Sequence, residues 1–517
     1  MSLAQRAFIA SLFTYLRFGL ALVVGVILVP FVLRRTGSHE YGLWIVTGEL
    51  LAYAALVDFG LVSILPWLVA ECDGRSDATS LRALITHGML LSGVAAVLYG
   101  LAAIALWSVA PTALSLSVGD RLALRGPFMV MIVATMCGYP LRIFSAFLVG
   151  VQDVVWNGLA AIAQALANVV ITVVLLVHGY GLYALALGLA VPQLAALVAD
   201  AARASRVRPE VFRTWQSPTW AGMSSMATVG LAAWIGAVGV QLVAGTNGTV
   251  VAFVQEAAAV PIFICTLKLS QILVQMCWIV PDSGLIGLAR LHGEGRLDRV
   301  QAVVETMLRM LLMSSGLAAC VVLMVNRTFV TWWVGPQFFS GHVVTALFAV
   351  GIVSASLIHG LLCVPAVLGA RLGAGVVTLI WGGTQIGLAL ILGYRWGFEG
   401  IATASVVSAL AIGLPLGFRL LRSKTGMTAR YVWTAIVSKW SKRCILPGAC
   451  AAALMLRQDG DADAYHVFGA ASVLLLYVLS MRPLYRELAG VRSVSRWLAL
   501  QPSAVVQRFA ALARLSS

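Results

Sequence analysis

Residues 16–71 read LRFGLALVVGVILVPFVLRRTGSHEYGLWIVTGELLAYAALVDFGLVSILPWLVAE. Two apolar runs flank a polar turn at residues 34–42, and each run reaches the length of about 17–25 residues that a helix needs to cross a bilayer. The stretch therefore predicts a membrane hairpin. Two acids, Glu49 and Asp58, lie inside its second apolar run and call for an explanation.

The composition of the whole chain is that of a polytopic membrane protein. Of its 517 residues, 61% are hydrophobic and only 11% are charged, whereas soluble proteins carry roughly a quarter charged residues. The sequence predicts an all-α membrane protein of about 14 transmembrane helices. Their apolar runs are centred near residues 20, 55, 96, 138, 168, 190, 230, 262, 314, 355, 382, 408, 450 and 473.

The positions of the basic residues predict the orientation of these helices. The loops before odd-numbered helices, together with both tails, hold 25 of the 35 Lys and Arg residues, and the opposite loops hold seven. Because basic residues favour the cytoplasmic side, both termini are expected in the cytoplasm. The net charge of +15 is thus mostly a matter of topology, with some attraction to anionic membrane lipids. The sequence contains no basic patch with interleaved aromatic residues, which is the pattern that would indicate nucleic-acid binding.

The chain also contains an internal repeat. Three matching pairs of segments, about 220 residues apart, keep the same order and the same predicted side of the membrane. They are DGRSDATSLRALITHGMLLSG and EGRLDRVQAVVETMLRMLLMSSG, FLVG (147–150) and AVLG (366–369), and YGLYALALG (180–188) and WGFEGIATA (396–404).

The repeat predicts a domain organisation of two parallel six-helix lobes. We expect an N-terminal lobe over residues 1–200, a basic cytoplasmic linker over 201–218, and a C-terminal lobe over 219–424. Residues 425–517 would add a basic loop, two further helices and a cytoplasmic tail. Parallel six-helix repeats are a transporter architecture, with the substrate path between the lobes.

A few ionisable residues lie well inside the predicted helices, and they are the candidate site. Each costs at least ~2.5 kcal/mol near the centre of a bilayer unless it is paired or faces water, so each is a functional candidate. They are Arg17, Glu49, Asp58, Glu256 and Lys268.

Distance from the hairpin turns predicts how deep these residues lie. Arg17 and Asp58 are each about 20 residues from the centre of the first turn, so straight helices would place them at one depth. They are candidate ion-pair partners, with either a structural or a substrate-binding role. Lys268 lies equally far beyond the second turn, GTNG at 245–248, and would join them in an inner cluster.

The remaining two acids would form an outer layer. Glu49 lies nine residues before Asp58, about 2.5 helical turns, so it faces the other way and lies ~13 Å nearer the outside. Glu256 has a similar depth in the second lobe. Glu49 and Glu256 are candidates either for ion coupling or for hydrogen bonding to neighbouring helices while protonated.

The opening segment resembles the start of bacterial polysaccharide flippases, which carry O-antigen or exopolysaccharide units. These proteins belong to the multidrug/oligosaccharidyl-lipid/polysaccharide (MOP) exporter superfamily. The openings of the segments at 180–188 and 396–404 are also similar to that family. The residues that carry the resemblance in the first hairpin are Pro30 and Leu33, then Gly37, Tyr41 and Gly42, and then Val57 to Leu61.

This resemblance implies a function and roles for the candidate site. It implies alternating-access transport of an undecaprenyl-diphosphate-linked oligosaccharide across the bacterial cytoplasmic membrane. Arg17 and Lys268 would hold the diphosphate, and Asp58 would position Arg17. Polysaccharide polymerase and chain-length machinery are candidate partners. The chain lacks the arginine-rich first two helices expected of lipid II flippases.

Three alternative functions are a multidrug or small-molecule exporter of the same superfamily, a membrane glycosyltransferase or polymerase, and a non-transporting scaffold. The enzymes need catalytic acids or arginines in large outer loops, whereas the outer loops here are short, so we expect no enzyme. Eight scattered cysteines and seven unclustered histidines predict no metal and no cofactor. His359 is interpreted as a core residue whose hydrogen bonds are satisfied.

Overall fold

The computed structural model describes residues 3–75, 77–212, 216–457 and 464–490, and the regular structure of these residues is entirely helical. Ten stretches of these described residues are long and apolar enough to cross a membrane. The backbone breaks at Gly37 in the first stretch, and at Gly369 and Gly397 in the stretch His342–Thr425. The three breaks divide these ten stretches into thirteen helices. The shorter α17 (Ser438–Leu456) corresponds to the predicted thirteenth helix and brings the number to the predicted fourteen. The predicted all-α polytopic fold is confirmed.

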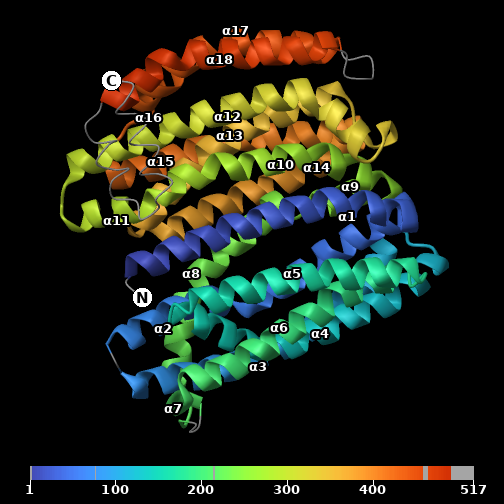
Figure 1. The fold of residues 1–517 in the computed structure, drawn as a ribbon, viewed down its shortest axis with the longest axis vertical. Helices are drawn as coiled ribbons and strands as arrows, with labels where there is room; N and C mark the ends of the chain where they lie inside the picture. Colours follow the sequence, from blue (N-terminus) through green and yellow to red (C-terminus); the bar gives the residue numbers. More distant parts are fainter. Residues whose placement is uncertain (1–2, 76, 213–215, 458–463, 491–517) are drawn as a thin grey trace. The chain divides into compact units, whose positions relative to one another are not determined.

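The contacts divide the chain into two compact units. The first unit comprises Met1–Gln241 and Glu256–Ala258, and the second comprises Leu242–Gln255 and Ala259–Ser517. The helices of the first unit, labelled in Figure 1, are α1 (Leu3–Ala54), the 3-10 turn η1 (Ala55–Asp58), α2 (Leu61–Gly74), α3 (Ala78–Ala113), α4 (Val118–Gly150), α5 (Val154–Val177), α6 (Leu182–Val207), α7 (Pro209–Phe212) and α8 (Trp220–Ala244).

Side chains cap the helix ends of the first unit. Asp77 accepts hydrogen bonds from the backbone N–H groups of Thr79 and Ser80 and so begins α3. Its hydrogen bonds with Ser80 hold the pKa of Asp77 below its ordinary value. A capping box of Ser117 and Asp120 begins α4 in the same way. The cores of these helices meet on α4, where Tyr139 and Phe147 are fully buried.

The second unit is built around α12 and α13. The α12 residues Val304, Leu308 and Leu311 are fully buried against Leu361 of α13. The helices of this unit are α9 (Asn247–Val254), η2 (Ala257–Ala259, which straddles the division), α10 (Val260–Ser283), α11 (Leu285–Gly293), α12 (Leu297–Trp333), η3 (Pro336–Phe338), α13 (His342–Pro365), the π turn η4 (Ala366–Ala370), α14 (Arg371–Ser408), η5 (Ala409–Gly413), α15 (Leu414–Thr425), α16 (Ala429–Val432), η6 (Trp433–Val437), α17 (Ser438–Leu456) and α18 (Ala464–Gly490).

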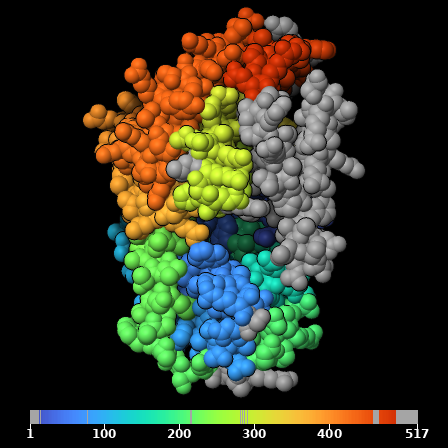
Figure 2. All heavy atoms as spheres, turned by 90° about the vertical axis from the view of Figure 1, so that its left-hand side faces the viewer, coloured from blue at the N-terminus to red at the C-terminus, as the bar shows by residue number. Residues whose placement is uncertain are grey.

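The two C-terminal helices α17 and α18 pack on the second unit. Figure 1 shows them next to α12, and Figure 2 shows their orange and red atoms together at one end of this unit. The buried Tyr477 of α18 donates a hydrogen bond of 2.7 Å to the carbonyl oxygen of Met313 on α12. Gly316, one turn further along α12, leaves room for the Tyr477 hydroxyl. The two predicted C-terminal helices are thus attached to the second unit by specific packing.

The internal repeat appears in the backbone itself. Gly181 and Gly397 occupy matching positions of the repeated segments YGLYALALG and WGFEGIATA. Gly181 has φ 51° and ψ −131°, and Gly397 has φ 57° and ψ −132°. Only glycine adopts such a conformation readily, because a Cβ atom would clash with the backbone. The two repeated segments therefore share a backbone conformation at this position, while the division into two six-helix lobes stays a prediction.

The contacts divide the chain one helix later than the repeat does. The sequence placed residues 219–424 together, whereas α8 groups with the first unit as far as Gln241. The reason is a close approach between α8 and the end of η1: a Cβ at Gly60 would lie 2.5 Å from the carbonyl oxygen of Gly230. Two glycines therefore let the backbones touch.

The predicted linker at residues 201–218 is largely ordered against the first unit. Helix α6 continues through it to Val207, and α7 follows at once. Arg208 forms an ion pair of 2.7 Å with Asp73 at the end of α2. Residues 213–215 of this linker, and residues 491–517 of the predicted tail, lie outside the described residues.

Candidate functional site

The second predicted membrane helix is broken next to one of its acids. The α-helical part of α1 after Gly37 gives way to η1, and Phe59 and Gly60 then take positive φ angles of 49° and 73° before α2 begins. A positive φ is uncommon for a bulky residue such as Phe59. The Asp58 carboxylate accepts a 3.0 Å hydrogen bond from the N–H of Gly60 and so stabilises the break.

Side chains from other helices satisfy the carbonyl groups that this break exposes. The hydroxyl of Tyr139 on α4 donates a 3.0 Å hydrogen bond to the carbonyl oxygen of Ala55. The indole N–H of Trp234 on α8 donates to that of Leu56. Because an unsatisfied carbonyl inside a membrane protein costs several kcal/mol, these bonds are what make the break tolerable. The break is therefore built by tertiary contacts.

Arg142 of α4 supplies the positive charge at the break. Its charge acts on the carboxylate of Asp58, and its guanidinium carbon lies 4.9 Å from the centre of the Tyr139 ring. Tyr139 in turn packs on Tyr99 of α3, with ring centres 5.6 Å apart, and is fully buried. We call Asp58, Tyr139, Arg142 and Trp234 the helix-break site.

The predicted ion pair between Arg17 and Asp58 is wrong. Both side chains are described, and no salt bridge joins them; Arg17 is exposed on α1, whereas Asp58 is half-buried. Equal depth does not fix the direction in which a side chain points, and the Asp58 carboxylate binds the N–H of Gly60 at the break instead. The cation near Asp58 comes instead from α4.

The other predicted residues are not brought together within either unit. Glu49 is half-buried in α1 and has an interaction partner. Glu256 is exposed where the backbone between α9 and η2 breaks, after Gln255. Lys268 is half-buried on α10 in the second unit, and its positive charge interacts electrostatically with the buried thiol of Cys265. The inner cluster and the outer layer of acids therefore stay predictions.

Sequence reasoning missed Arg142. It was counted with the basic residues of the cytoplasmic loops, although the predicted helix centred near residue 138 is long enough to include it. The structure continues α4 to Gly150, which places Arg142 eight residues inside the helix. The signal was present in YPLR, residues 139–142, where an arginine follows a tyrosine at the i, i+3 spacing that brings two side chains to one helix face.

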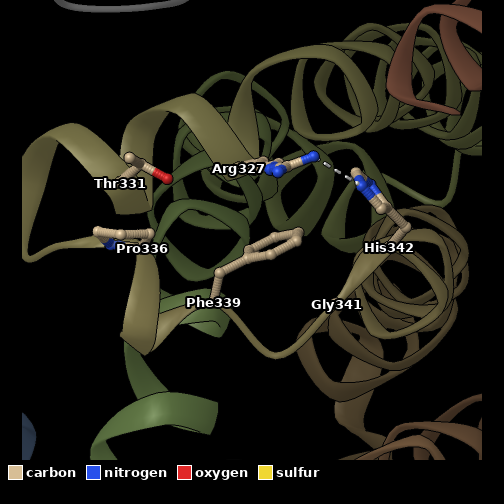
Figure 3. Close-up of a pocket in the computed structure, with 6 residues that line it drawn as sticks. All are labelled: Arg327, Thr331, Pro336, Phe339, Gly341 and His342. Carbon is tan, nitrogen blue, oxygen red and sulfur yellow. Dashed lines mark hydrogen bonds between the residues drawn. The ribbon is translucent and has the colours of Figure 1, made fainter. Parts of the chain in front are cut away.

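The second unit holds a small cavity at the junction of α12 and α13. Figure 3 shows Arg327 of α12 pointing toward His342, with the ring of Phe339 below them. The Arg327 guanidinium lies 3.4 Å from the imidazole of His342. The cavity has a volume of about 390 Å³ and is lined by Arg327, Thr331, Pro336, Phe339, Gly341 and His342. Such a rim offers positive charge and an aromatic face to a polar ligand.

Solved structures of the MOP superfamily are similar to this chain over most of its length. A multidrug resistance MATE family transporter of the MOP superfamily, in an inward-facing conformation, matches with a TM-score of 0.59 at 14% identity, over 82% of this chain and 97% of that one. The chain has the MOP fold. No protein-family model matches the sequence, and no curated protein sequence is significantly similar to it.

Two further MOP structures show the same fold. The lipid II flippase MurJ, in an inward-closed conformation, has a TM-score of 0.56 at 12% identity and covers 88% of this chain and 99% of its own. A MOP superfamily transporter from Pyrococcus furiosus has a TM-score of 0.56 at 14% identity, over 82% and 96%. These MOP neighbours are transporters and flippases, not enzymes.

Substitutions of Asp58 separate its hydrogen bond from its charge. Asp58→Asn retains an oxygen that accepts the Gly60 N–H, and we expect it to fold with nearly wild-type stability. Asp58→Ala removes the acceptor and is expected to destabilise the protein by about 1–3 kcal/mol. Thermal unfolding of the purified protein in detergent measures both. If the asparagine variant loses as much stability as the alanine variant, the carboxylate acts through its charge and not through the turn.

Proposed function

We propose that the protein is an alternating-access flippase for an undecaprenyl-diphosphate-linked oligosaccharide in a bacterial cytoplasmic membrane. The observation that carries the proposal is the MOP fold, which this chain shares with a lipid II flippase over 88% of its length. The matched transporter of the MATE family covers 82%. The resemblance of residues 16–71 to polysaccharide flippases points to the same class of substrate.

The helix-break site gives the proposed cycle a place at which a membrane helix can bend. In several families of secondary transporter, discontinuous helices form the ligand sites. Here the break lies between two helical segments, α1 after Gly37 and α2, and its hydrogen bonds come from α4 and α8. A change in these bonds would reorient α2 relative to α1. In the proposal, Asp58 and Arg142 hold the break in the conformation that the structure shows.

The diphosphate would be held by cations that the fold leaves available. Arg17 is exposed and Lys268 is half-buried, and neither has a salt bridge with another described residue. A guanidinium group matches phosphate oxygens in pairs, and a flexible ammonium adds a point charge. Glu49 and Glu256 are the proposed proton or cation carriers that couple the cycle to an ion gradient.

Complementation of a flippase-deficient strain tests this proposal. We expect the wild-type chain to restore surface polysaccharide, and Arg17→Ala and Lys268→Ala to reduce it at least about tenfold, since a hydrogen bond to a charged group contributes about 1.5–3 kcal/mol. Arg125→Ala and Lys442→Ala, which remove exposed basic residues elsewhere, are the matched controls. Full restoration by both test variants at normal protein levels would refute the diphosphate role.

Export of small organic molecules is the second candidate function. It is favoured by the TM-score of 0.59 with a multidrug resistance MATE family transporter, which is larger than the 0.56 with the lipid II flippase. The same strain separates the candidates: an exporter raises the tolerated drug concentration and leaves surface polysaccharide absent. Collapse of the proton gradient or removal of sodium would then show whether Glu49 and Glu256 have an ion to carry.

A further inference from the structure

The second unit brings three potential metal ligands together at the end of α10. Asp282 on α10 and His359 on α13 are joined by a 2.7 Å contact between the carboxylate oxygen and the imidazole Nε2. The thiol of Cys363, four residues after His359, lies 3.5 Å from the same ring. One ligand atom from each residue lies within 4.8 Å of the other two.

We propose that Asp282, His359 and Cys363 form a binding site for a late first-row divalent metal ion of the Zn²⁺ class. This site lies outside the helix-break site and does not depend on the proposed flippase function. The spacing of the two residues on α13 is i, i+4, which places both side chains on one helix face. The third residue, Asp282, is 77 residues from His359 in the sequence, so no local pattern indicates that the three side chains meet.

The kinds of donor atom favour a transition metal. Imidazole nitrogen, thiolate sulfur and carboxylate oxygen are the ligands that Zn²⁺ accepts, whereas Mg²⁺ and Ca²⁺ prefer oxygen alone. Asp282 also lies in the last turn of α10, which ends at Ser283. A carboxylate there adds to the negative end of the helix dipole, and a bound cation would offset both.

The imidazole is held in place before any metal binds. The rings of Trp278 and His359 are parallel, with centres 4.0 Å apart. The indole N–H of Trp278 donates a 3.3 Å hydrogen bond to Ser356, which fixes the indole in turn. Contacts of this kind around a ligand typically change metal affinity by 10–100-fold. Trp278 and Ser356 therefore restrict His359 to one orientation toward Asp282.

Small side-chain movements are enough to form the coordination geometry. A tetrahedral Zn²⁺ with bonds of about 2.0–2.3 Å sets its ligand atoms roughly 3.3–3.7 Å apart. The carboxylate must therefore retreat from Nε2 by less than about 1 Å. The Cys363 sulfur lies 3.5 Å from both ring nitrogens, so it must turn about its Cα–Cβ bond to face the metal at Nε2. Water would supply the fourth ligand, since the Asp282 side chain is 40% exposed.

Titration of the full-length protein with Co²⁺, in detergent and with excess Mg²⁺, tests the site. We expect one Co²⁺ per chain, the intense visible bands of tetrahedral Co²⁺, a thiolate-to-metal band in the ultraviolet, and loss of all of these on adding Zn²⁺. Cys363→Ser should abolish the thiolate band, and it and His359→Gln should weaken binding at least about tenfold. Cys137→Ser, which removes an exposed thiol on α4, is the matched control.

Two results would overturn the proposal. One is wild-type protein that binds no Co²⁺ or Zn²⁺ at millimolar concentration, and the other is equal affinity in wild type, Cys363→Ser and His359→Gln. A second measurement covers variants that fold poorly: Zn²⁺ should raise the melting temperature of the wild type but not that of Asp282→Asn, whose altered side chain keeps its size. An equal rise in both would equally count against the site.

Discussion

Alanine at Gly60 is expected to be among the most damaging single substitutions in the first unit. Its Cβ would lie 2.5 Å from the carbonyl oxygen of Gly230 and 3.0 Å from the backbone nitrogen of Trp234, so neither neighbour can yield by moving a side chain. Overpacking of this kind costs about 1–3 kcal/mol. The positive φ of 73° at Gly60 adds about 1–2 kcal/mol for any residue with a Cβ.

Gly230→Ala separates these two effects. Gly230 has ordinary helical geometry, and a Cβ there would lie 2.5 Å from the carbonyl oxygen of Phe59. We therefore expect Gly230→Ala to show the packing cost alone, about 1–3 kcal/mol. Gly93→Ala is the matched control, since a Cβ on this α3 residue meets nothing within 4 Å. The unfolding temperatures of Gly60→Ala, Gly230→Ala and Gly93→Ala, measured in detergent, compare the two costs with the control.

The same variants examine whether the contact between η1 and α8 belongs to the transport cycle. If η1 and α8 must separate during the transport cycle, Gly230→Ala destabilises the conformation in which they touch. Its transport rate should then change by more than its loss of stability explains. Equal stability of Gly60→Ala, Gly230→Ala and Gly93→Ala would contradict the close approach itself.

Loss of Arg309 is expected to have the second large effect, in the second unit. The Arg309 side chain is only 12% exposed, and it binds Glu305 on its own helix and Glu487 on α18, the latter at 3.0 Å. Glu305 also accepts a 2.8 Å hydrogen bond from Tyr431, and this bond raises the pKa of the Tyr431 hydroxyl. One arginine therefore joins α12 to the C-terminal helices.

Arg309→Met is expected to cost about 3 kcal/mol, because it leaves Glu305 largely buried without its cation. Arg75→Ala is the matched control: Arg75 forms the same i, i+4 pair with Glu71, but the two side chains are 73% and 53% exposed. Such a surface pair contributes about 0–1 kcal/mol. The double variant Arg309→Met with Glu305→Gln should recover part of the loss. Equal unfolding temperatures for the Arg309 and Arg75 variants would show that the buried network does not stabilise the protein.

Local sequence was sufficient for the membrane class and for the helix pattern. Apolar runs predicted the helices, and the turn centred on Gly37 was recognised because polar and glycine residues interrupt the apolar pattern there. The repeat was recognised for the same reason. Its paired glycines, Gly181 and Gly397, take a backbone conformation that only glycine adopts readily. The presence of glycine at both positions therefore indicates that conformation in the sequence.

The candidate site was predicted only in part. Asp58 was singled out as an unusual intramembrane acid, but its cationic neighbour is Arg142, 84 residues away on α4, and not Arg17 on the preceding helix. His359 was interpreted as a core residue with satisfied hydrogen bonds, and it does contact Asp282 and Cys363. The error therefore concerned the partner of Asp58.

The amino-acid sequence alone indicates which segments form membrane helices, because hydropathy and backbone preference depend on residues close together in the chain. Which polar groups meet depends on the tertiary structure. The break after Asp58 shows why: Tyr139 and Trp234 satisfy its carbonyl groups from helices far away in the sequence. A helix that bends only because distant side chains support it changes the depth and direction of every residue beyond the bend, and no local pattern contains that information.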